Sequence, residues 1–323
     1  MGNQQSRQLK QRGFKQSTKE TSGTSSDESP TELSFRYVGG RTFRRDIPYM
    51  FPVDEREAMR LEKQQIVAKL TWQGNFSLPI DDHLKAGGLK ILDVGCGPGI
   101  WITEMAETYP LCTFTGVDVS PVYPLKELPE NVEFIQADIL NGLPIEDSEF
   151  DFVVMHFLSD CFTIRQWKSI VIQEVARVMK PGAWLEWMES GSTLKNEGEN
   201  TKKLRQSLYS AANSRGVSPW TVNEIPKMLD NSGIFVNIRV GKRTVIFSSA
   251  GGKCGELFTD VAISTYQALK KQTMEFMSIT PHEYDLLLYK IREEFEQYQT
   301  SAEYYRFCSQ KIVIDIEEID GEE

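Results

Sequence analysis

Three glycines at alternate positions separate an apolar segment from a helical pattern: Gly95, Gly97 and Gly99. Glycine has no Cβ, so a strand-to-helix turn made of it lets a ligand lie close to the backbone. An acid, Asp93, stands two residues before the first glycine, and Asp118 ends the next apolar segment. A carboxylate about 20 residues after such a turn holds ribose hydroxyls in nucleotide-binding folds. These residues predict a site for a cofactor that contains a nucleoside.

The glycine spacing excludes a dinucleotide. The pattern G-x-G-x-x-G would need its last glycine at Ile100 or Ile102, and no G-x-x-x-x-G-K-[ST] phosphate loop is present. An acid before the turn suits a cationic ligand, and S-adenosylmethionine combines a sulfonium with a ribose, an adenine and an amino acid end. Residues 93–99 resemble motif I of the class I S-adenosylmethionine-dependent methyltransferases. A glycine turn without a ligand is the alternative.

Composition limits the class of protein. The 323 residues, 40% of them hydrophobic, suffice for one sizeable core with appendages, and the net charge of −10 argues against a general nucleic-acid surface. Five scattered cysteines without a C-x-x-C pair indicate a reducing compartment. No apolar run approaches about 18 residues, three dispersed histidines suggest no metal site, and no secretory segment is evident. We expect a cytoplasmic protein, while a nuclear location stays open.

The N-terminal arm, residues 1–33, has almost no apolar residues, and we expect it to be disordered. Met1-Gly2 with Ser6 fits the N-myristoylation pattern, which also arises by chance. Residues 7–19 add five basic side chains and no acid. One acyl chain with a basic patch would allow peripheral contact with the inner face of a membrane.

A methyltransferase-like domain is expected over residues 34–312, followed by an acidic tail over 313–323. Its lead-in, 34–80, begins with a loop-like aromatic segment at 35–41, and Asp54 is the expected N-cap of a helix over 55–70. An apolar stripe of this helix is expected to pack on the core: Met59, Leu61, Ile66, Val67 and Leu70. The resemblance to methyltransferases implies an alternative, in which the helix closes over the cofactor.

Strand and helix signals alternate through the core, residues 81–190. Strands are predicted at 91–94, 113–117, 132–136, 152–155 and 183–187, with helices at 100–108 and 167–178. In the C-terminal part, 191–312, helices at 201–215 and 223–231 precede strands at 235–239 and 304–312, which flank a helical insertion at 255–300. This order predicts an α/β, Rossmann-like, doubly wound seven-stranded sheet, parallel with an antiparallel edge strand, and the insertion as a lid.

Further motifs resemble the fungal methyltransferases related to the velvet-complex regulator of secondary metabolism. The resemblance covers about residues 35–312, and its motifs are Tyr49-x-Phe-Pro-x-Asp54, Glu57, Arg60-Leu61, Asp93–Gly99, Phe150–His156, Val178–Glu189, Thr280–Tyr284, Tyr298 and Tyr304–Phe307. Gly182-Ala183 departs from the commoner double glycine, in a turn that is structural.

The resemblance implies a set of cofactor-binding residues at the carboxyl ends of the strands: Asp93, Gly95, Cys96, Gly97, Gly99, Asp118, Val119, Asp138 and Ile139. Asp118 would accept both ribose hydroxyls. Asp138 would hold the adenine amino group beside the Ile139 amide, or would simply cap a helix. Asp93 would hold the amino end of the cofactor, or would fix the turn by accepting backbone N–H bonds.

His156 follows the fourth predicted strand, where it would act as a general base or only line the pocket. In-line methyl transfer needs mainly alignment and a dry site, so a base is not required. The Asn/Asp-Pro-Pro-Tyr signature of enzymes that methylate nucleic-acid amino groups is absent after this strand.

The sequence therefore predicts a methyltransferase that uses S-adenosylmethionine and an unidentified acceptor, either a small molecule or a protein. The alternative is a catalytically silent regulatory or scaffold protein that binds the cofactor and a partner and that the N-terminal arm could tether to a membrane. An oxidoreductase is disfavoured, because the glycine register of a dinucleotide site is missing.

Overall fold

The computed structural model describes residues 14–15, 35–45, 49–120 and 128–313. The expectations for the N-terminal arm, its myristoylation pattern and the acidic tail fall almost wholly outside these residues.

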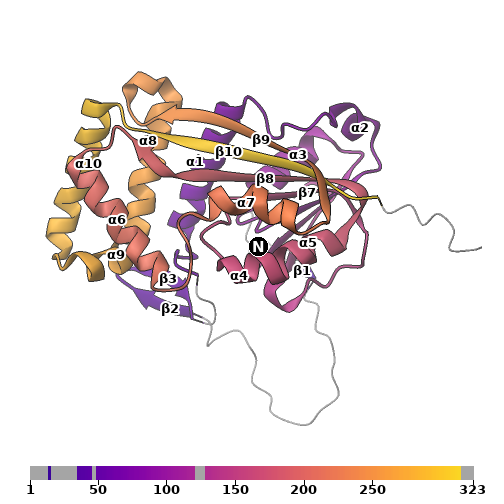
Figure 1. The fold of residues 1–323 in the computed structure, drawn as a ribbon, viewed down its shortest axis with the longest axis horizontal. Coiled ribbons are helices and arrows are strands. Elements are labelled where there is room, and N and C mark those ends of the chain that lie inside the picture. The colour runs from indigo at the N-terminus through magenta and orange to yellow at the C-terminus, as the bar shows by residue number, and fades with distance from the viewer. Residues whose placement is uncertain (1–13, 16–34, 46–48, 121–127, 314–323) are drawn as a thin grey trace, which may run out of the picture.

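An eight-stranded sheet forms the centre of the fold, in the order β1-β6-β5-β4-β7-β8-β10-β9 (Figure 1). Its strands are β1 (Phe14–Lys15), β4 (Lys90–Val94), β5 (Thr113–Asp118), β6 (Val132–Gln136), β7 (Phe150–His156), β8 (Met179–Lys195), β9 (Phe235–Ile246) and β10 (Ser301–Lys311). The pairs from β1 to β8 are parallel, whereas β10 runs antiparallel to both β8 and β9. Strands β4 to β10 are the seven predicted ones, so the fold class is confirmed.

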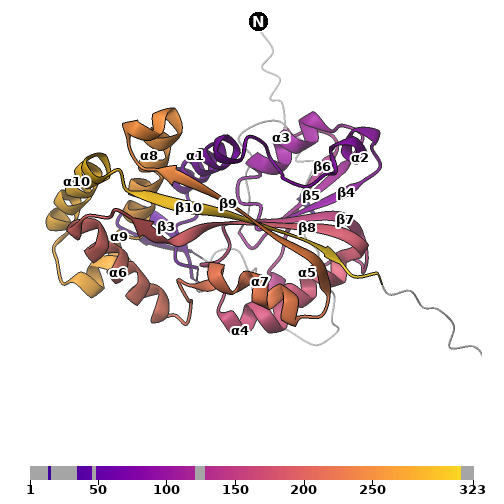
Figure 2. The same ribbon diagram turned by 45° about the horizontal axis from the view of Figure 1, so that its top comes forward.

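Helices cover both faces of the sheet, and a helical group extends beyond one end (Figure 2). The α-helices are α1 (Glu55–Trp72), α2 (Asp81–Ala86), α3 (Ile100–Thr108), α4 (Ile164–Gln166), α5 (Ile172–Val178), α6 (Glu199–Asn213), α7 (Thr221–Asn231), α8 (Gly252–Ala268), α9 (Lys270–Met277) and α10 (Pro281–Tyr298). A π-helical segment, η2 (Trp167–Val171), joins α4 to α5, and two 3-10 turns are η1 (Ile139–Asn141) and η3 (Ser249–Gly251).

The alternation of side chains along β4 builds two cores. Leu92 packs in one cluster with Trp167 and Trp187, whereas Ile91 packs in the other with Trp101 of α3. This follows from the two-residue period of a strand. A third cluster joins α1, α8 and α10 to the C-terminal end of β9 and the N-terminal end of β10. The insertion is therefore a helical part with a core of its own, next to the carboxyl ends of the parallel strands.

Two lead-in predictions were wrong. The segment 35–41 belongs to a hairpin of β2 (Phe35–Val38) and β3 (Arg41–Arg44), not a loop. Its turn is Gly39-Gly40, with φ of 58° and 72°, the backbone that a tight hairpin needs.

The second correction concerns α1. Its N-cap is Asp54, as predicted, and the carboxylate accepts the Glu57 N–H at 3.1 Å. Three members of the expected apolar stripe are exposed, however: Met59 (53%), Ile66 (42%) and Leu70 (47%). Val67 is buried as expected, together with Ala68. The other buried side chains of α1 are polar or charged and line a cavity: Glu57, Arg60 and Gln64.

Replacing Gly99 by alanine is expected to destabilise the protein by about 2–4 kcal/mol. Gly99 caps α3 with φ of 72°, and a Cβ there would lie 2.4 Å from Cζ of the buried Phe134 ring. Chemical denaturation measures the loss. Gly88→Ala is the matched control, since Gly88 has φ of 80° but a Cβ added to it would meet no atom within 4 Å. Equal losses in the two variants would show that the ring overlap costs nothing.

Candidate functional site

A cavity of about 580 Å³ opens at the carboxyl ends of β4, β5, β6 and β7 and continues between α1 and α8. Its size is within the range of small-molecule sites. Nine of the ten predicted site residues line it: Asp93, Gly95, Cys96, Gly97, Asp118, Val119, Asp138, Ile139 and His156. The tenth predicted residue, Gly99, is not part of the cavity wall; it shapes the glycine turn instead.

Asp118 ties the glycine turn to the end of β5. One carboxylate oxygen accepts the Gly97 N–H at 2.9 Å, and the other accepts the Ser120 N–H at 2.8 Å. Burial raises the pKa of this carboxyl, although both hydrogen bonds oppose that effect. A carboxylate has about four lone-pair sites. Asp118 therefore keeps acceptor capacity for the ribose hydroxyls that remain its predicted ligands.

Asp93 is only 2% exposed, and its carboxylate accepts no hydrogen bond from the residues that the structure describes. Burial, together with the charge of Asp118, raises the Asp93 pKa to about 8. The turn is thus held by Asp118, and the alternative in which Asp93 fixes it is not observed. A buried carboxyl that no other group stabilises suits a cationic ligand.

Asp138 caps the short turn η1, because its side chain accepts the Leu140 N–H at 2.9 Å. The capping alternative is therefore present in the structure. It is compatible with a second role at the adenine, since Asp138 and Ile139 both line the cavity.

His156 ends β7 with its ring edge against Trp101, the centroids 5.4 Å apart. Its Nε2 is buried and has no partner among the described residues. Burial, with a smaller contribution from Arg306, lowers the His156 pKa to about 3. Such an imidazole is neutral at pH 7 and a weak base, so this geometry favours the pocket-lining alternative over general-base catalysis.

The loop that follows His156 is held by an acid whose role the sequence did not reveal. Phe157 has φ of 58°, which is uncommon for a residue with a side chain. One oxygen of Glu189 accepts the N–H groups of Leu158 (2.8 Å), Ser159 (2.9 Å) and the Trp187 indole (2.7 Å). Burial raises the Glu189 pKa to about 8 in spite of these bonds. The only sequence signal was an acid at the end of a strand pattern.

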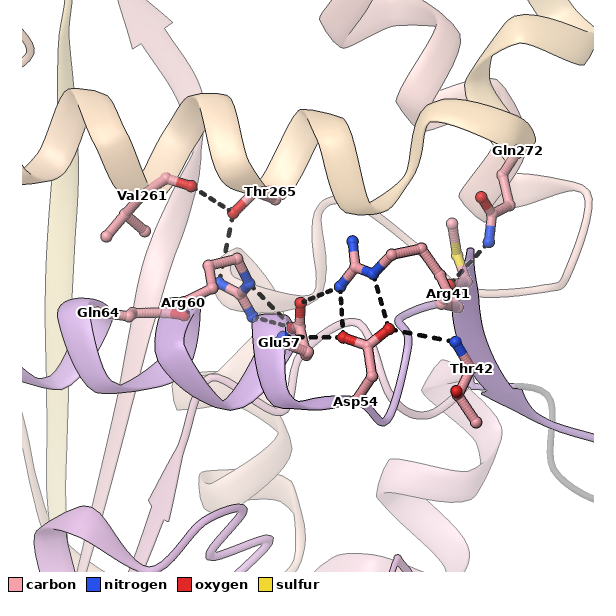
Figure 3. Close-up of polar contacts among 10 residues, drawn as sticks. Arg41, Thr42, Asp54, Glu57, Arg60, Gln64, Val261, Thr265 and Gln272 are labelled. Carbon is pink, nitrogen blue, oxygen red and sulfur yellow. Dashed lines mark hydrogen bonds and ion pairs between the residues drawn. The ribbon is translucent and has the colours of Figure 1, made fainter. Parts of the chain in front are cut away.

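Charged side chains join the lead-in to the insertion (Figure 3). Arg41 of β3 forms a two-pronged pair with Asp54, at 2.7 and 2.9 Å. On the buried face of α1, Arg60 donates to Glu57 at 2.6 and 2.9 Å and reaches the Thr265 hydroxyl of α8 at 3.3 Å. This cluster connects the wall of the cavity to the helix that covers it.

Arg60→Met is expected to cost about 3–5 kcal/mol of unfolding free energy, because it leaves the Glu57 carboxylate buried without its close partner. Arg41 lies 3.9 Å from Glu57 and compensates only weakly. The double variant Arg60→Met with Glu57→Leu is expected to recover most of the loss, since two apolar side chains replace a buried ion pair at little cost. Thermal and urea denaturation give both values. An additive double variant would contradict this account.

Residues 91–182 match the family described as "Methyltransferase domain". The "Secondary metabolism regulator laeA" of Monascus pilosus is 32% identical over 179 residues, which cover 53% of this chain and 46% of that protein. The "Methyltransferase pytC" of Aspergillus terreus is 31% identical over 180 residues, 53% of each chain. The "Protein-methionine methyltransferase laeA" of Emericella nidulans is 34% identical over 161 residues, 48% of this chain and 40% of that one. The chain thus spans about half the length of these relatives.

Several solved structures are similar to this chain at low sequence identity. The Haemonchus contortus phosphoethanolamine N-methyltransferase 2 in complex with S-adenosyl-L-methionine has a TM-score of 0.44 at 16% identity, covering 84% of this chain and 62% of that one. The [4+2]-cyclase SpnF has a TM-score of 0.48 at 16% identity, covering 83% and 98%. Within the described residues, no helix is long and apolar enough to cross a membrane, and no cluster of metal ligands occurs.

Proposed function

We propose that this chain is a class I S-adenosylmethionine-dependent methyltransferase that transfers the cofactor's methyl group to an acceptor bound between α1 and α8. The methyltransferase-domain match over residues 91–182 and the similarity to the LaeA-type regulators support this. The observation that supports this most is the continuity of one cavity. The glycine turn and its acids line one part of it, and the side chains of the lead-in and insertion line the other. When bound, S-adenosylmethionine supplies an electrophilic methyl group on a sulfonium.

The chain's own residues would align the reactants and exclude water. Asp118 orients the ribose, and Asp93 holds the cationic amino end. Aromatic side chains from the residue that follows β9, from α8 and from β10 make the far wall apolar: Phe247, Phe258, Tyr266 and Tyr304. Alignment in a dry site provides much of the acceleration available to an in-line displacement. The neutral His156 lines this space.

Labelled methyl transfer tests the proposal. The protein is incubated with methyl-labelled S-adenosylmethionine and separated protein and small-molecule fractions of a fungal extract. We expect labelled product that disappears with Asp118→Ala. Cofactor binding without any mutation-sensitive labelling would instead favour the second candidate, a silent cofactor-binding regulator, to which the name of the LaeA-type relatives points.

A further inference from the structure

Asp160 is an acid of the cavity wall without a structural role. It lies in the loop after β7, four residues beyond His156, and is exposed to the cavity space. Its carboxylate forms neither a hydrogen bond nor an ion pair with any residue in the described part of the chain. Desolvation of the carboxylate by the cavity wall raises the Asp160 pKa above the ordinary value of an aspartate. Of the acids at this end of β7, Glu189 accepts the Leu158, Ser159 and Trp187 N–H groups with one carboxylate oxygen, whereas neither oxygen of Asp160 has a partner among the described residues.

The position of Asp160 is fixed by its loop. Glu189 accepts the N–H groups of the two residues that precede Asp160, at 2.8 and 2.9 Å. The chain enters the loop through the left-handed conformation of Phe157, whose N–H donates to Met188 O at 2.8 Å. A carboxylate held in this way beside the predicted methyl-transfer site is placed to meet a reactant.

The charges of the wall select the kind of reactant. Eight carboxyl groups line the cavity: Asp54, Glu55, Glu57, Asp93, Asp118, Asp138, Asp160 and Glu189. Four of them contribute little to the negative field near pH 7, because Asp54 and Glu57 pair with arginines and burial raises the pKa of Asp93 and of Glu189 to about 8. In the described wall, the cationic side chain is Arg60, and its guanidinium is already bound to Glu57. An acceptor with a carboxylate or phosphate would enter against this field, whereas an amine would be attracted by it.

We propose that Asp160 receives the nucleophilic amine of the methyl acceptor, and that this acceptor is an amine on an apolar body. The inference rests on the proposed function. As the nitrogen lone pair forms the new C–N bond, the C–S bond breaks and its electron pair stays on sulfur. Before the attack, the bound ammonium gives one proton to the Asp160 carboxylate, which passes it to water, and this frees the nitrogen lone pair. The aromatic wall of the insertion surrounds the apolar body.

Three probes on one scaffold test the charge preference: 2-naphthylmethylamine, 2-naphthylmethanol and 2-naphthoate. Each is titrated by calorimetry into the full chain saturated with S-adenosylhomocysteine, so that the cofactor part of the cavity is filled. We expect the amine to bind at least tenfold more tightly than the carboxylate, with the alcohol between them. Equal affinities, or no binding of any probe, would overturn the inference.

Asp160→Asn is expected to weaken binding of the amine about tenfold and to leave the alcohol unchanged. Asp147→Asn is the matched control, because it makes the same change in net charge at the opposite end of β7, where Asp147 pairs with Arg177 at 2.6 Å. An amine affinity that falls equally in both variants, or in neither, would reject the role of Asp160. Unchanged S-adenosylhomocysteine binding in Asp160→Asn shows that the variant is folded. Failure of the unaltered protein to bind that ligand would instead count against the proposed function.

Discussion

Asp118→Ala is expected to weaken S-adenosylmethionine binding by about 100-fold or more. The carboxylate would make charge-assisted hydrogen bonds to two ribose hydroxyls, each contributing about 1.5–3 kcal/mol. It also accepts the N–H groups of Gly97 and Ser120, so its loss releases both sides of the glycine turn. Isothermal titration calorimetry on the cofactor-free protein measures the change directly.

The variant Asp118→Asn separates the two contributions. The amide keeps one acceptor oxygen, which can still bind a turn N–H, but it loses the bidentate acceptor for the ribose. We expect a smaller loss than in the alanine variant, with a melting temperature near that of the unaltered protein. An alanine variant that binds with unaltered affinity would show that the ribose lies elsewhere.

The glycine turn and its acids were predictable because their chemistry is local in sequence. Three glycines, Asp93 and the end of the next strand lie within 26 residues, and the rule that ligands bind at strand carboxyl ends placed Asp138 and His156 beside them. The structure brings these residues to one cavity, as that rule requires.

The buried face of α1 was not predictable by the same reasoning. Hydrophobic periodicity assumes that a buried helix face is apolar, and it selected Met59, Ile66 and Leu70, which are exposed. The actual buried face holds Arg60, whose partner Thr265 lies 205 residues away in sequence. A local pattern does not contain such a contact. The hairpin at 35–44 is different, because Gly39-Gly40 between aromatic residues is itself a hairpin signal.

The lengths of strands were also not predictable from the local sequence. The prediction ended one strand at Trp187, shortly before the polar residues Glu189 and Ser190, yet β8 continues to Lys195. The continuation depends on antiparallel pairing with β10, which follows about a hundred residues later. The alternation of apolar and polar side chains is weaker in this part of β8, because it faces the helical insertion rather than the sheet core. The length of a strand therefore depended on a partner that the local sequence does not specify.

S-adenosylmethionine affinity is expected to rise about fifty-fold between pH 6 and pH 8 and to level off above that. Asp93 has a pKa of about 8 in the cofactor-free protein, so at pH 6 only about one molecule in a hundred carries the carboxylate that a cationic amino end requires. Calorimetry across this range gives the slope. The free energy of unfolding of the cofactor-free protein is expected to change in the opposite sense. The folded protein keeps a proton that the unfolded chain loses above its ordinary pKa near 4, so stability falls as the pH rises from about 4 to 8.

Asp93→Asn assigns the titration, since it is expected to remove the slope while leaving the fold intact. A slope that persists in this variant would belong to Glu189, the other cavity acid with a pKa near 8. S-adenosylhomocysteine distinguishes the ends of the cofactor: it lacks the sulfonium charge but keeps the amino group, so the same slope is expected if Asp93 binds that group. Asp118 supplies the remaining check. Its charge helps to raise the Asp93 pKa, so Asp118→Asn should move the midpoint of the affinity curve to lower pH.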